Sequence, residues 1–313
     1  MSEFQSWSSI HQTIRASDWN ALLDHGLEKP TSYIIRKNGS YYEVINGSTG
    51  KIDYGGANNA GGVSGSDAAT VIQAALDTGK RVLIKEGDFD INTTLKMPDA
   101  GGAELLGIGR QLTTLNWKGS GFCIEQTTKT NRVDNLRVAD LKIDATGNSN
   151  SSGLIDMTGW SDSLLERLYL IGNDNAGEVG VKINGNEGGT AVGTYWDELR
   201  HITITTVKTG ILLTGEWANG MANAHTLYKC RVYGGDYGFN FDIGCGNSAF
   251  GCIAEGFGTA GCRFGRGIEN GWYGGYMESS LNNADCFLLE SNATDVIIAT
   301  GRSNAGPGGS IIN

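Results

Sequence analysis

Two glutamates, Glu255 and Glu278, are the side chains best placed for chemistry, because each occupies the same point of a repeated alternating segment. If successive copies stack as neighbouring parallel strands about 4.8 Å apart, the two carboxylates lie roughly 5 to 6 Å from each other. Like charges at that distance raise the pKa of one carboxyl group. A protonated acid beside an ionised carboxylate, about 5 to 5.5 Å apart, is the catalytic arrangement of a retaining glycosidase.

The register of this column comes from segments of the form G-apolar-x-apolar that follow each copy. Counted back from those segments, four apolar residues share one inward position: Ile204, Val232, Ala254 and Met277. Their next neighbours point outward, because side chains alternate along a strand. The predicted outward column is Asp144, Ile171, Thr205, Tyr233, Glu255 and Glu278. Tyr233 would offer a ring face to a sugar.

The same column supports other interpretations. Paired carboxylates, together with carbonyl and water oxygens, can bind calcium, so calcium is a candidate ligand although no cofactor is required. Arg231 and Lys229, in the coil next to Glu255, are the nearest basic residues. We expect Arg231 to bind substrate, and either residue is a candidate base for proton abstraction. Solvated glutamates without a chemical role are the structural alternative.

Four tryptophans are further candidates for binding a sugar. Trp160, Trp217 and Trp272 occupy variable loops or their edges, where insertions are commonly functional. Trp196 belongs to YWDELRH, residues 195–201, in which an aromatic ring, carboxylates and basic side chains follow a glycine-rich loop. Such a cluster suits sugar faces and hydroxyl groups. A structural turn with one salt bridge is the alternative for residues 195–201.

An internal repeat predicts the elements that position these residues. The G-apolar-x-apolar segment recurs as GLIDM, GVKIN, GILLT, GFNFD and GCRFG, and a second alternating strand lies between successive copies. Periods of about 20 to 30 residues built only of short strands are typical of a β-solenoid. The spaced-leucine consensus of leucine-rich repeats is missing, and a propeller needs about four strands in 40 residues. We therefore predict a parallel β-helix over residues 61–313.

Residues 1–60 differ from the repeat and are predicted to form an adaptor or attachment module. Ser17 and Asp18 precede a short amphipathic helix pattern, and residues 33–56 alternate around NG turns as a small hairpin or meander does. A glycine-rich stretch at 55–65 leads to a second helix signal, in which Ser66 or Asp67 caps AATVIQAALDTG. This helix would cap the first coil.

The run SDAATVIQAALDTGKRVLIKEGDFDINTTLKM, followed by AELLGIG and TTLNW, resembles the N-terminal cap and first coils of the pectate-lyase-like superfamily. That superfamily includes tail spikes of phages and archaeal viruses. The resemblance implies a right-handed, single-stranded all-β helix and, for the viral members, a homotrimer on the virion surface or outside the cell. The polygalacturonase motifs and the WxDH motif of pectate lyases are absent, so no catalytic residue is transferred.

Composition limits the partners. The formal net charge of −10 argues against nucleic acid or an anionic membrane, since no basic stripe is present. No apolar run approaches the ~20 residues of a membrane span, so we expect no membrane insertion. MSEFQSWSSIHQ shows no signal-peptide pattern. The six cysteines show no zinc-ligand spacing and are expected to be small core residues.

Three hypotheses follow. The first is a tail-spike-like or cell-surface protein that binds a polysaccharide or cell-surface glycan on the β-helix face and degrades it as a hydrolase or lyase. The second is a non-catalytic trimeric structural or receptor-binding fibre. The third is a free-standing lyase, hydrolase or epimerase for uronic-acid polymers, which would depend on calcium.

Overall fold

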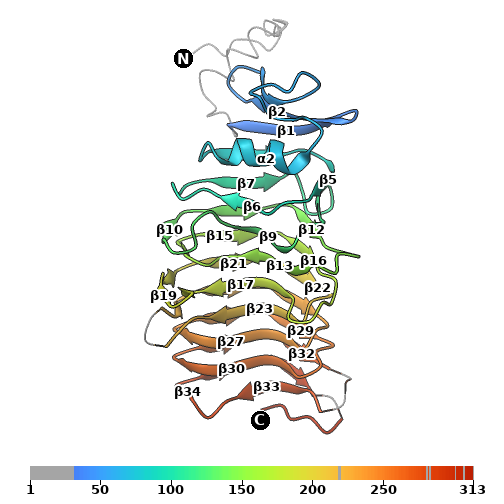
Figure 1. Ribbon diagram of the computed structural model, residues 1–313. Helices are drawn as coiled ribbons and strands as arrows, with labels where there is room; N and C mark the ends of the chain where they lie inside the picture. The colour runs from blue at the N-terminus through green and yellow to red at the C-terminus, as the bar shows by residue number, and fades with distance from the viewer. Residues whose placement is uncertain are drawn as a thin grey trace, which may run out of the picture.

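The structure, a computed structural model, describes residues 32–313 apart from 218–219, 280, 282, 300, 306 and 313. Three long sheets, here called A, B and C, run along a common axis, and each coil of the chain adds one strand to each of them in turn. Figure 1 shows the coils stacked from the N-terminal to the C-terminal end. The predicted parallel β-helix is confirmed by this topology.

Sheet A begins with a three-stranded antiparallel meander and continues with parallel strands. Its strands in spatial order are β3 (Ile52–Gly55), β2 (Tyr41–Asn46), β1 (Tyr33–Asn38), β4 (Arg81–Ile84), β7 (Glu104–Gly107), β11 (Arg137–Ala139), β15 (Leu164–Glu166), β21 (Glu198–Arg200), β25 (Thr226–Tyr228), β28 (Ser248–Phe250), β31 (Gly271–Tyr273) and β35 (Ile297–Ala299). The predicted hairpin or meander is therefore present. Its strand β1 pairs in parallel with β4, so the meander continues sheet A.

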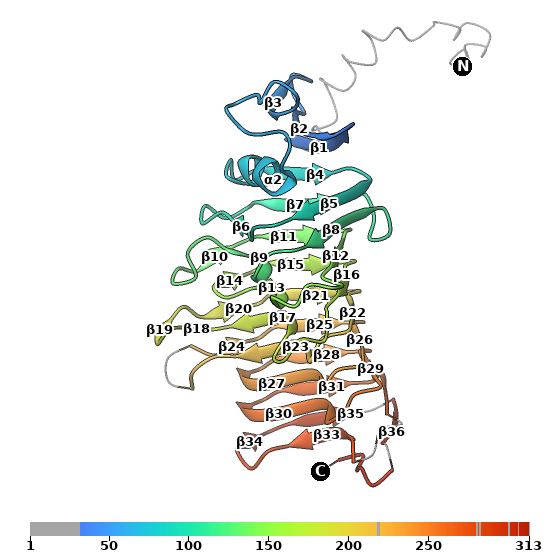
Figure 2. The ribbon, with the colours of Figure 1, turned by 45° about the vertical axis from the view of Figure 1, so that its right-hand side comes forward.

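Sheet B is the narrow sheet that carries the predicted column, and its strands follow one another down the right-hand side of Figure 2. They are β5 (Gly87–Ile91), β8 (Thr113–Trp117), β12 (Lys142–Asp144), β16 (Tyr169–Ile171), β22 (Thr203–Thr205), β26 (Arg231–Tyr233), β29 (Ile253–Glu255), β32 (Tyr276–Glu278) and β36 (Arg302–Asn304).

Sheet C contains the longest strands of the coils. Its main row is β6 (Leu95–Met97), β9 (Gly121–Gln126), β13 (Ser151–Asp156), β17 (Val179–Asn184), β23 (Thr209–Thr214), β27 (Tyr237–Cys245), β30 (Ala260–Ile268) and β33 (Asp285–Leu289). Short strands beside this row are β10 (Val133–Asp134), β14 (Trp160–Ser161), β20 (Thr194–Tyr195), β24 (Ala222–Asn223) and β34 (Ala293–Thr294). A hairpin of β18 (Asn186–Glu187) and β19 (Thr190–Ala191) projects from the coil of β17.

A left-handed residue turns the chain at six successive corners between sheets A and B. The residues at this corner in successive coils are Asp140, Arg167, His201, Lys229, Gly251 and Gly274, all with φ between 51° and 68°. This conformation costs a residue with a side chain roughly 1 to 2 kcal/mol, whereas glycine adopts it freely. At this corner, the four coils from β11 to β26 have residues with side chains, and the next two coils have glycine.

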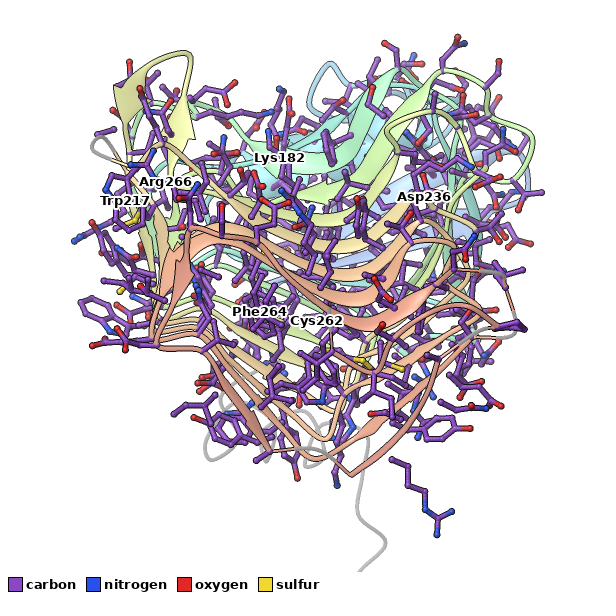
Figure 3. The ribbon with its side chains drawn as sticks, turned by 90° about the horizontal axis from the view of Figure 1, so that it is seen from below. Lys182, Trp217, Asp236, Cys262, Phe264 and Arg266 are labelled. Carbon is purple, nitrogen blue, oxygen red and sulfur yellow. The ribbon has the colours of Figure 1, made fainter. Side chains whose placement is uncertain are left out.

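The interior is filled by apolar ladders. Ile204, Val232, Ala254 and Met277 are register partners on β22, β26, β29 and β32, and all four are buried, as predicted. Figure 3, a view from below, shows Cys262 and Phe264 inside the coil. All six cysteines are free thiols, and all except the half-buried Cys245 lie in the core, which agrees with their predicted role as small core residues.

Helix α2 (Ala68–Leu76) covers the first coil, at the position predicted for a capping helix. The Asp67 carboxylate accepts a hydrogen bond from the amide of Ala69, which satisfies one free donor at the helix N-terminus. The apolar face, including Val71, Ile72 and Leu76, is fully buried against the first strands. The helix predicted after Ser17 and Asp18 lies outside the described residues.

Candidate functional site

The outward column of sheet B has the register predicted from the sequence. Thr205 pairs with Tyr233, Tyr233 with Glu255, and Glu255 with Glu278, each on the next strand of the sheet. The column continues upstream through Ile171 and Asp144. All of these side chains are half-buried on the outer surface. Because neighbouring strands are about 4.8 Å apart, the two glutamates face the solvent side by side.

Tyr276 is a member of this site that sequence reasoning missed. It lies two residues before Glu278 on β32, hence on the same face, and its hydroxyl donates a hydrogen bond to Glu278 Oε2. That hydrogen bond, followed by burial and the charges of Glu278 and Glu255, raises the pKa of Tyr276. Tyr276 therefore keeps its proton and orients one carboxylate. The alternation in the YMES segment was the available signal.

Arg231 lies on β26 two residues before Tyr233, so both side chains project from the same face of sheet B. It is exposed and has no carboxylate partner among the described residues. Arg231 also lines a cavity of about 520 Å³ at the corner between sheets A and B. The other lining residues are Gly109, Arg110, Asp140, Arg167, His201, Thr203 and Lys229. Neither Glu255 nor Glu278 lines this cavity.

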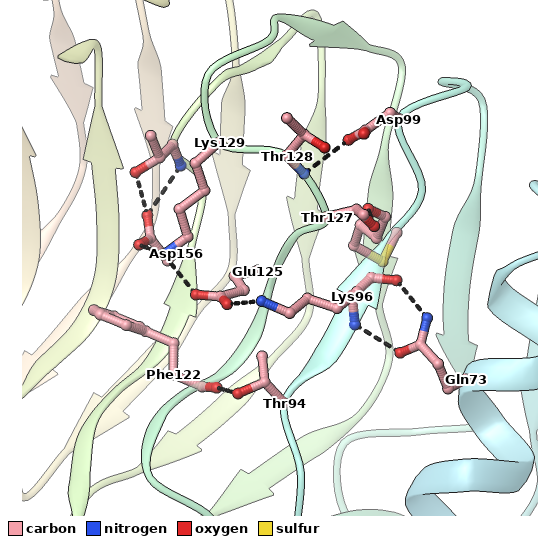
Figure 4. Close-up of polar contacts among 12 residues, drawn as sticks. Gln73, Thr94, Lys96, Asp99, Phe122, Glu125, Thr127, Thr128, Lys129 and Asp156 are labelled. Carbon is pink, nitrogen blue, oxygen red and sulfur yellow. Dashed lines mark hydrogen bonds and ion pairs between the residues drawn. The ribbon is translucent and has the colours of Figure 1, made fainter. Parts of the chain in front are cut away.

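On sheet C an ionic ladder crosses four coils; Figure 4 shows its part from Lys96 to Asp156. Lys96 contacts Glu125, Lys129 bridges Glu125 and Asp156, and Lys182 lies 3.5 Å from Asp156. Burial raises the pKa of Asp156, but the charges of Lys182 and Lys129 and hydrogen bonds outweigh it, so the pKa falls below its usual range. The charges in this ladder are mutually satisfied, which indicates a structural role.

Two of the four tryptophans predicted to bind a sugar, Trp160 and Trp272, lie in the core and not in surface loops. Trp160 and Trp272 are 0% and 1% exposed, so a bound sugar cannot reach their rings. They lie on strands β14 and β31, not in loops, with side chains on the inward side of the alternation. The Trp272 ring packs edge-on against Phe239 and Phe287, with ring centroids 5.1 and 5.8 Å away.

The other two tryptophans remain at the surface. Trp196 is 57% exposed at a left-handed corner, with its ring centroid 5.5 Å from that of Tyr195. Trp217 is half-buried, and the guanidinium of Arg266 lies 4.6 Å from its ring centroid. Figure 3 shows the two residues on the same side of the molecule. One ring face of Trp217 is thus already occupied by a cation.

The predicted cluster at residues 195–201 does not face one surface. Glu198 and Arg200 form an ion pair outside the coil, whereas Asp197 is fully buried. Asp197 belongs to an internal polar ladder of stacked side chains in consecutive coils: Ser163, Asp197, His225, Asn247 and Asn270. The segment therefore does not gather these side chains at one surface, and its His201 lines the cavity between sheets A and B.

Among the residues that the structure describes, no group of three or more His, Cys, Asp or Glu side chains is placed to hold a metal ion. None of the described helices is long and apolar enough to cross a membrane.

No protein-family model and no curated protein matches the sequence. Solved structures do. An alginate lyase from Paenibacillus sp. str. FPU-7 superimposes with a TM-score of 0.54 at 12% identity, over 79% of this chain and 97% of that chain. The protein is thus a right-handed parallel β-helix, as the resemblance in the sequence implied.

Two viral proteins also match with lower scores. The tailspike protein of Acinetobacter baumannii phage AM24 gives a TM-score of 0.47 at 13% identity, over 76% of this chain and 42% of that chain. Geobacillus virus E2 ORF18 gives 0.46 at 13% identity, over 80% of this chain. This chain spans about 60% of the length of the Geobacillus virus protein.

Proposed function

We propose that this protein binds a polysaccharide along the outward face of sheet B and cleaves it with Glu255 and Glu278. One observation carries the proposal: an aromatic ring and two carboxyl groups occupy one outward column on consecutive strands. Tyr233 offers apolar surface to a sugar ring, and the neighbouring carboxyl groups are spaced for acid and base chemistry at a glycosidic bond.

The chemistry divides between the two glutamates. One carboxyl group donates a proton to the oxygen of the leaving sugar. The other either attacks the anomeric carbon or, as a general base, takes a proton from a water molecule that attacks it. Glu278 is held by the Tyr276 hydroxyl, whereas the Glu255 side chain has no hydrogen-bond partner among the described residues. This asymmetry assigns the oriented carboxylate to Glu278 and proton donation to Glu255. No metal is required, and calcium would have to share these two carboxylates.

Calorimetric titration with polysaccharides tests the binding half of the proposal. Replacing Tyr233 with alanine should weaken binding about tenfold, the loss expected for one aromatic contact. Tyr41→Ala is the matched control, because Tyr41 is 38% exposed on β2, away from sheet B. Equal affinity of wild type, Tyr233→Ala and Tyr41→Ala would place the ligand elsewhere.

The second candidate function is a non-catalytic trimeric fibre on a virion or cell surface. It is supported by the outer face of sheet A, where Tyr228, Phe250 and Tyr273 form a column on consecutive strands. Phe250 and Tyr273 stack with ring centroids 4.8 Å apart, yet Tyr228 and Phe250 are each 39% exposed. Such a column suits packing against a second copy. A trimer in sedimentation equilibrium, without cleavage of any glycan, would favour this candidate.

A further inference from the structure

We propose that the cavity at the corner between sheets A and B binds the anionic groups of an acidic glycan. This inference rests on the proposed function and adds the chemical class of the ligand. The lining of the cavity carries four permanent cations, Arg110, Arg167, Lys229 and Arg231, against one carboxylate, Asp140. In a chain of net charge −10, such an excess marks a local site for negative charge.

The single carboxylate is already used. Arg167 donates from Nε and Nη2 to the two carboxylate oxygens of Asp140, at 2.5 and 2.7 Å. This bidentate pair, joined by Glu166, neutralises Arg167 and fixes one wall of the cavity. The charge of the remaining cations is therefore not compensated by Asp140.

Three cations in the cavity lack a carboxylate partner among the described residues. Arg110 contacts only the Thr203 hydroxyl, at 3.4 Å, and Lys229 lies over the Tyr228 ring, 5.0 Å from its centroid. Arg231 is exposed. By contrast, Arg137 on sheet A contacts Glu104 and Glu166, and Arg263 on sheet C contacts Asp242 and Glu290. Three cations without a carboxylate partner therefore meet at one corner of the β-helix.

The cavity is assembled from distant parts of the chain. Arg110 lies between β7 and β8, yet its guanidinium reaches Thr203 on β22, across strands β12 and β16. Arg110 thus lines the cavity together with the corner residues His201 and Lys229. The volume of about 520 Å³ falls within the roughly 300 to 1,000 Å³ typical of ligand sites.

The position of the cavity explains why a cationic site would help the proposed reaction. Arg231 lines the cavity and shares strand and face with Tyr233, whose partner on the next strand is Glu255. An acidic polymer on this face meets the two glutamates, which repel it. Arginine and lysine at the adjoining corner neutralise that charge, and arginine offers paired donors to carboxylate, sulfate or phosphate groups.

The backbone at Lys229 supplies a variant that separates charge from folding. Lys229 has a φ of 51°, and Gly251 occupies the same corner in the next coil. Lys229→Gly removes the cation while relieving a left-handed backbone. We expect its melting temperature to equal or exceed that of the wild type. Arg231→Gln is the second variant, and Lys51→Gln, at an exposed turn remote from the cavity, is the control for loss of one charge.

The test measures affinities for a panel of uronate, sulfated and neutral oligosaccharides at constant ionic strength, together with thermal stabilisation by inorganic sulfate. We expect uronate or sulfated oligosaccharides to bind, and Lys229→Gly and Arg231→Gln to weaken binding at least tenfold, with Lys51→Gln unchanged. Tight binding of neutral oligosaccharides, unaffected by these variants, would overturn the inference and leave polysaccharide binding intact.

If no oligosaccharide binds, the sulfate measurement decides. Stabilisation by sulfate that is lost in Arg231→Gln would support an anion site and count against the proposed function. Equal stabilisation of the wild type and Arg231→Gln would overturn the anion site as well.

Discussion

Asp197 and His225 touch inside the β-helix, with Asp197 Oδ2 3.3 Å from His225 Nδ1 and both side chains fully buried. Nδ1 accepts a hydrogen bond from the Asp197 amide, and Nε2 lies 3.2 Å from Thr194 Oγ1. Burial raises the pKa of Asp197 well above 3.8 and lowers the pKa of His225 to about 3. The pair is thus most stable without charge.

Asp197→Asn should stabilise the protein above pH 6.5. There the unfolded His225 is already neutral. Because burial raises the pKa of Asp197 in the folded chain, the stability that its protonated form contributes is lost as pH rises through that pKa. Asparagine already occupies positions 247 and 270 of the same internal ladder. It does not titrate, so replacing Asp197 with it removes this loss of stability at high pH. We expect a gain of about 1 to 3 kcal/mol at pH 8 in urea unfolding.

Below pH 6.5, Asp197 and His225 change the stability of the folded state in opposite directions as pH rises. His225, with its lowered pKa, favours the folded state more as pH rises from about 3 to 6.5, whereas Asp197 favours it less above pH 3.8. In Asp197→Asn, the free energy of unfolding should therefore rise more steeply with pH than in the wild type between about pH 3 and 6.5, and then stay constant. Asp295→Asn, at an exposed corner, is the control. Parallel pH profiles for wild type and Asp197→Asn would contradict the account.

Trp272→Ala should lower the free energy of unfolding by about 3 to 5 kcal/mol, because the ring is buried between Phe239 and Phe287. Trp196→Ala, at a 57% exposed ring, should change it by less than about 0.5 kcal/mol. Denaturant titration measures both. A large loss in Trp196→Ala, or none in Trp272→Ala, would show that the burial assignment is wrong.

Tyr276→Phe should reduce kcat about tenfold with little change in KM, because the hydrogen bond to Glu278 orients a group that acts on the reacting bond. Tyr276 is a positioning residue, so the pH profile of kcat should shift in Tyr276→Phe. Steady-state kinetics across pH distinguish this from misfolding. An unchanged kcat and pH profile would remove Tyr276 from the mechanism.

Chelation with EDTA should leave cleavage unchanged, since the proposed chemistry uses only Glu255, Glu278 and Tyr276. Activity is measured before and after chelation, and again after added calcium. Loss in EDTA with recovery in calcium would show that the two carboxylates hold an ion.

The coil register was predictable because side chains alternate with period two and the repeat fixes where each strand begins. Glu255 beside Glu278 and the ladder through Val232 follow from these two rules alone. Trp160 and Trp272 were misplaced because the short strands β14 of sheet C and β31 of sheet A resemble loops in sequence. Whether such a ring points inward depends on a register that the G-apolar-x-apolar segments do not mark, because neither tryptophan lies in one.

The cavity was not predictable from local pattern. Arg231 was singled out, but its neighbour Arg110 meets Thr203 across 93 residues of sequence and two intervening strands. Arg167 and Lys229 enter the cavity only because the corner residues of consecutive coils align. These contacts depend on how the coils stack and on the direction in which each loop runs. The period of the repeat predicts the stacking of the coils but not the direction of the loops.

The most direct test of the central claim is cleavage of a bound polysaccharide by wild type, Glu255→Gln and Glu278→Gln, with Glu86→Gln, at an exposed residue, as control. Reducing-end release reports hydrolysis, and absorbance at about 235 nm, characteristic of an unsaturated sugar, reports elimination. We predict that either glutamine variant lowers the rate at least 100-fold while retaining binding, since both carboxyl groups take part in one step. Cleavage at the wild-type rate in both variants would contradict the account.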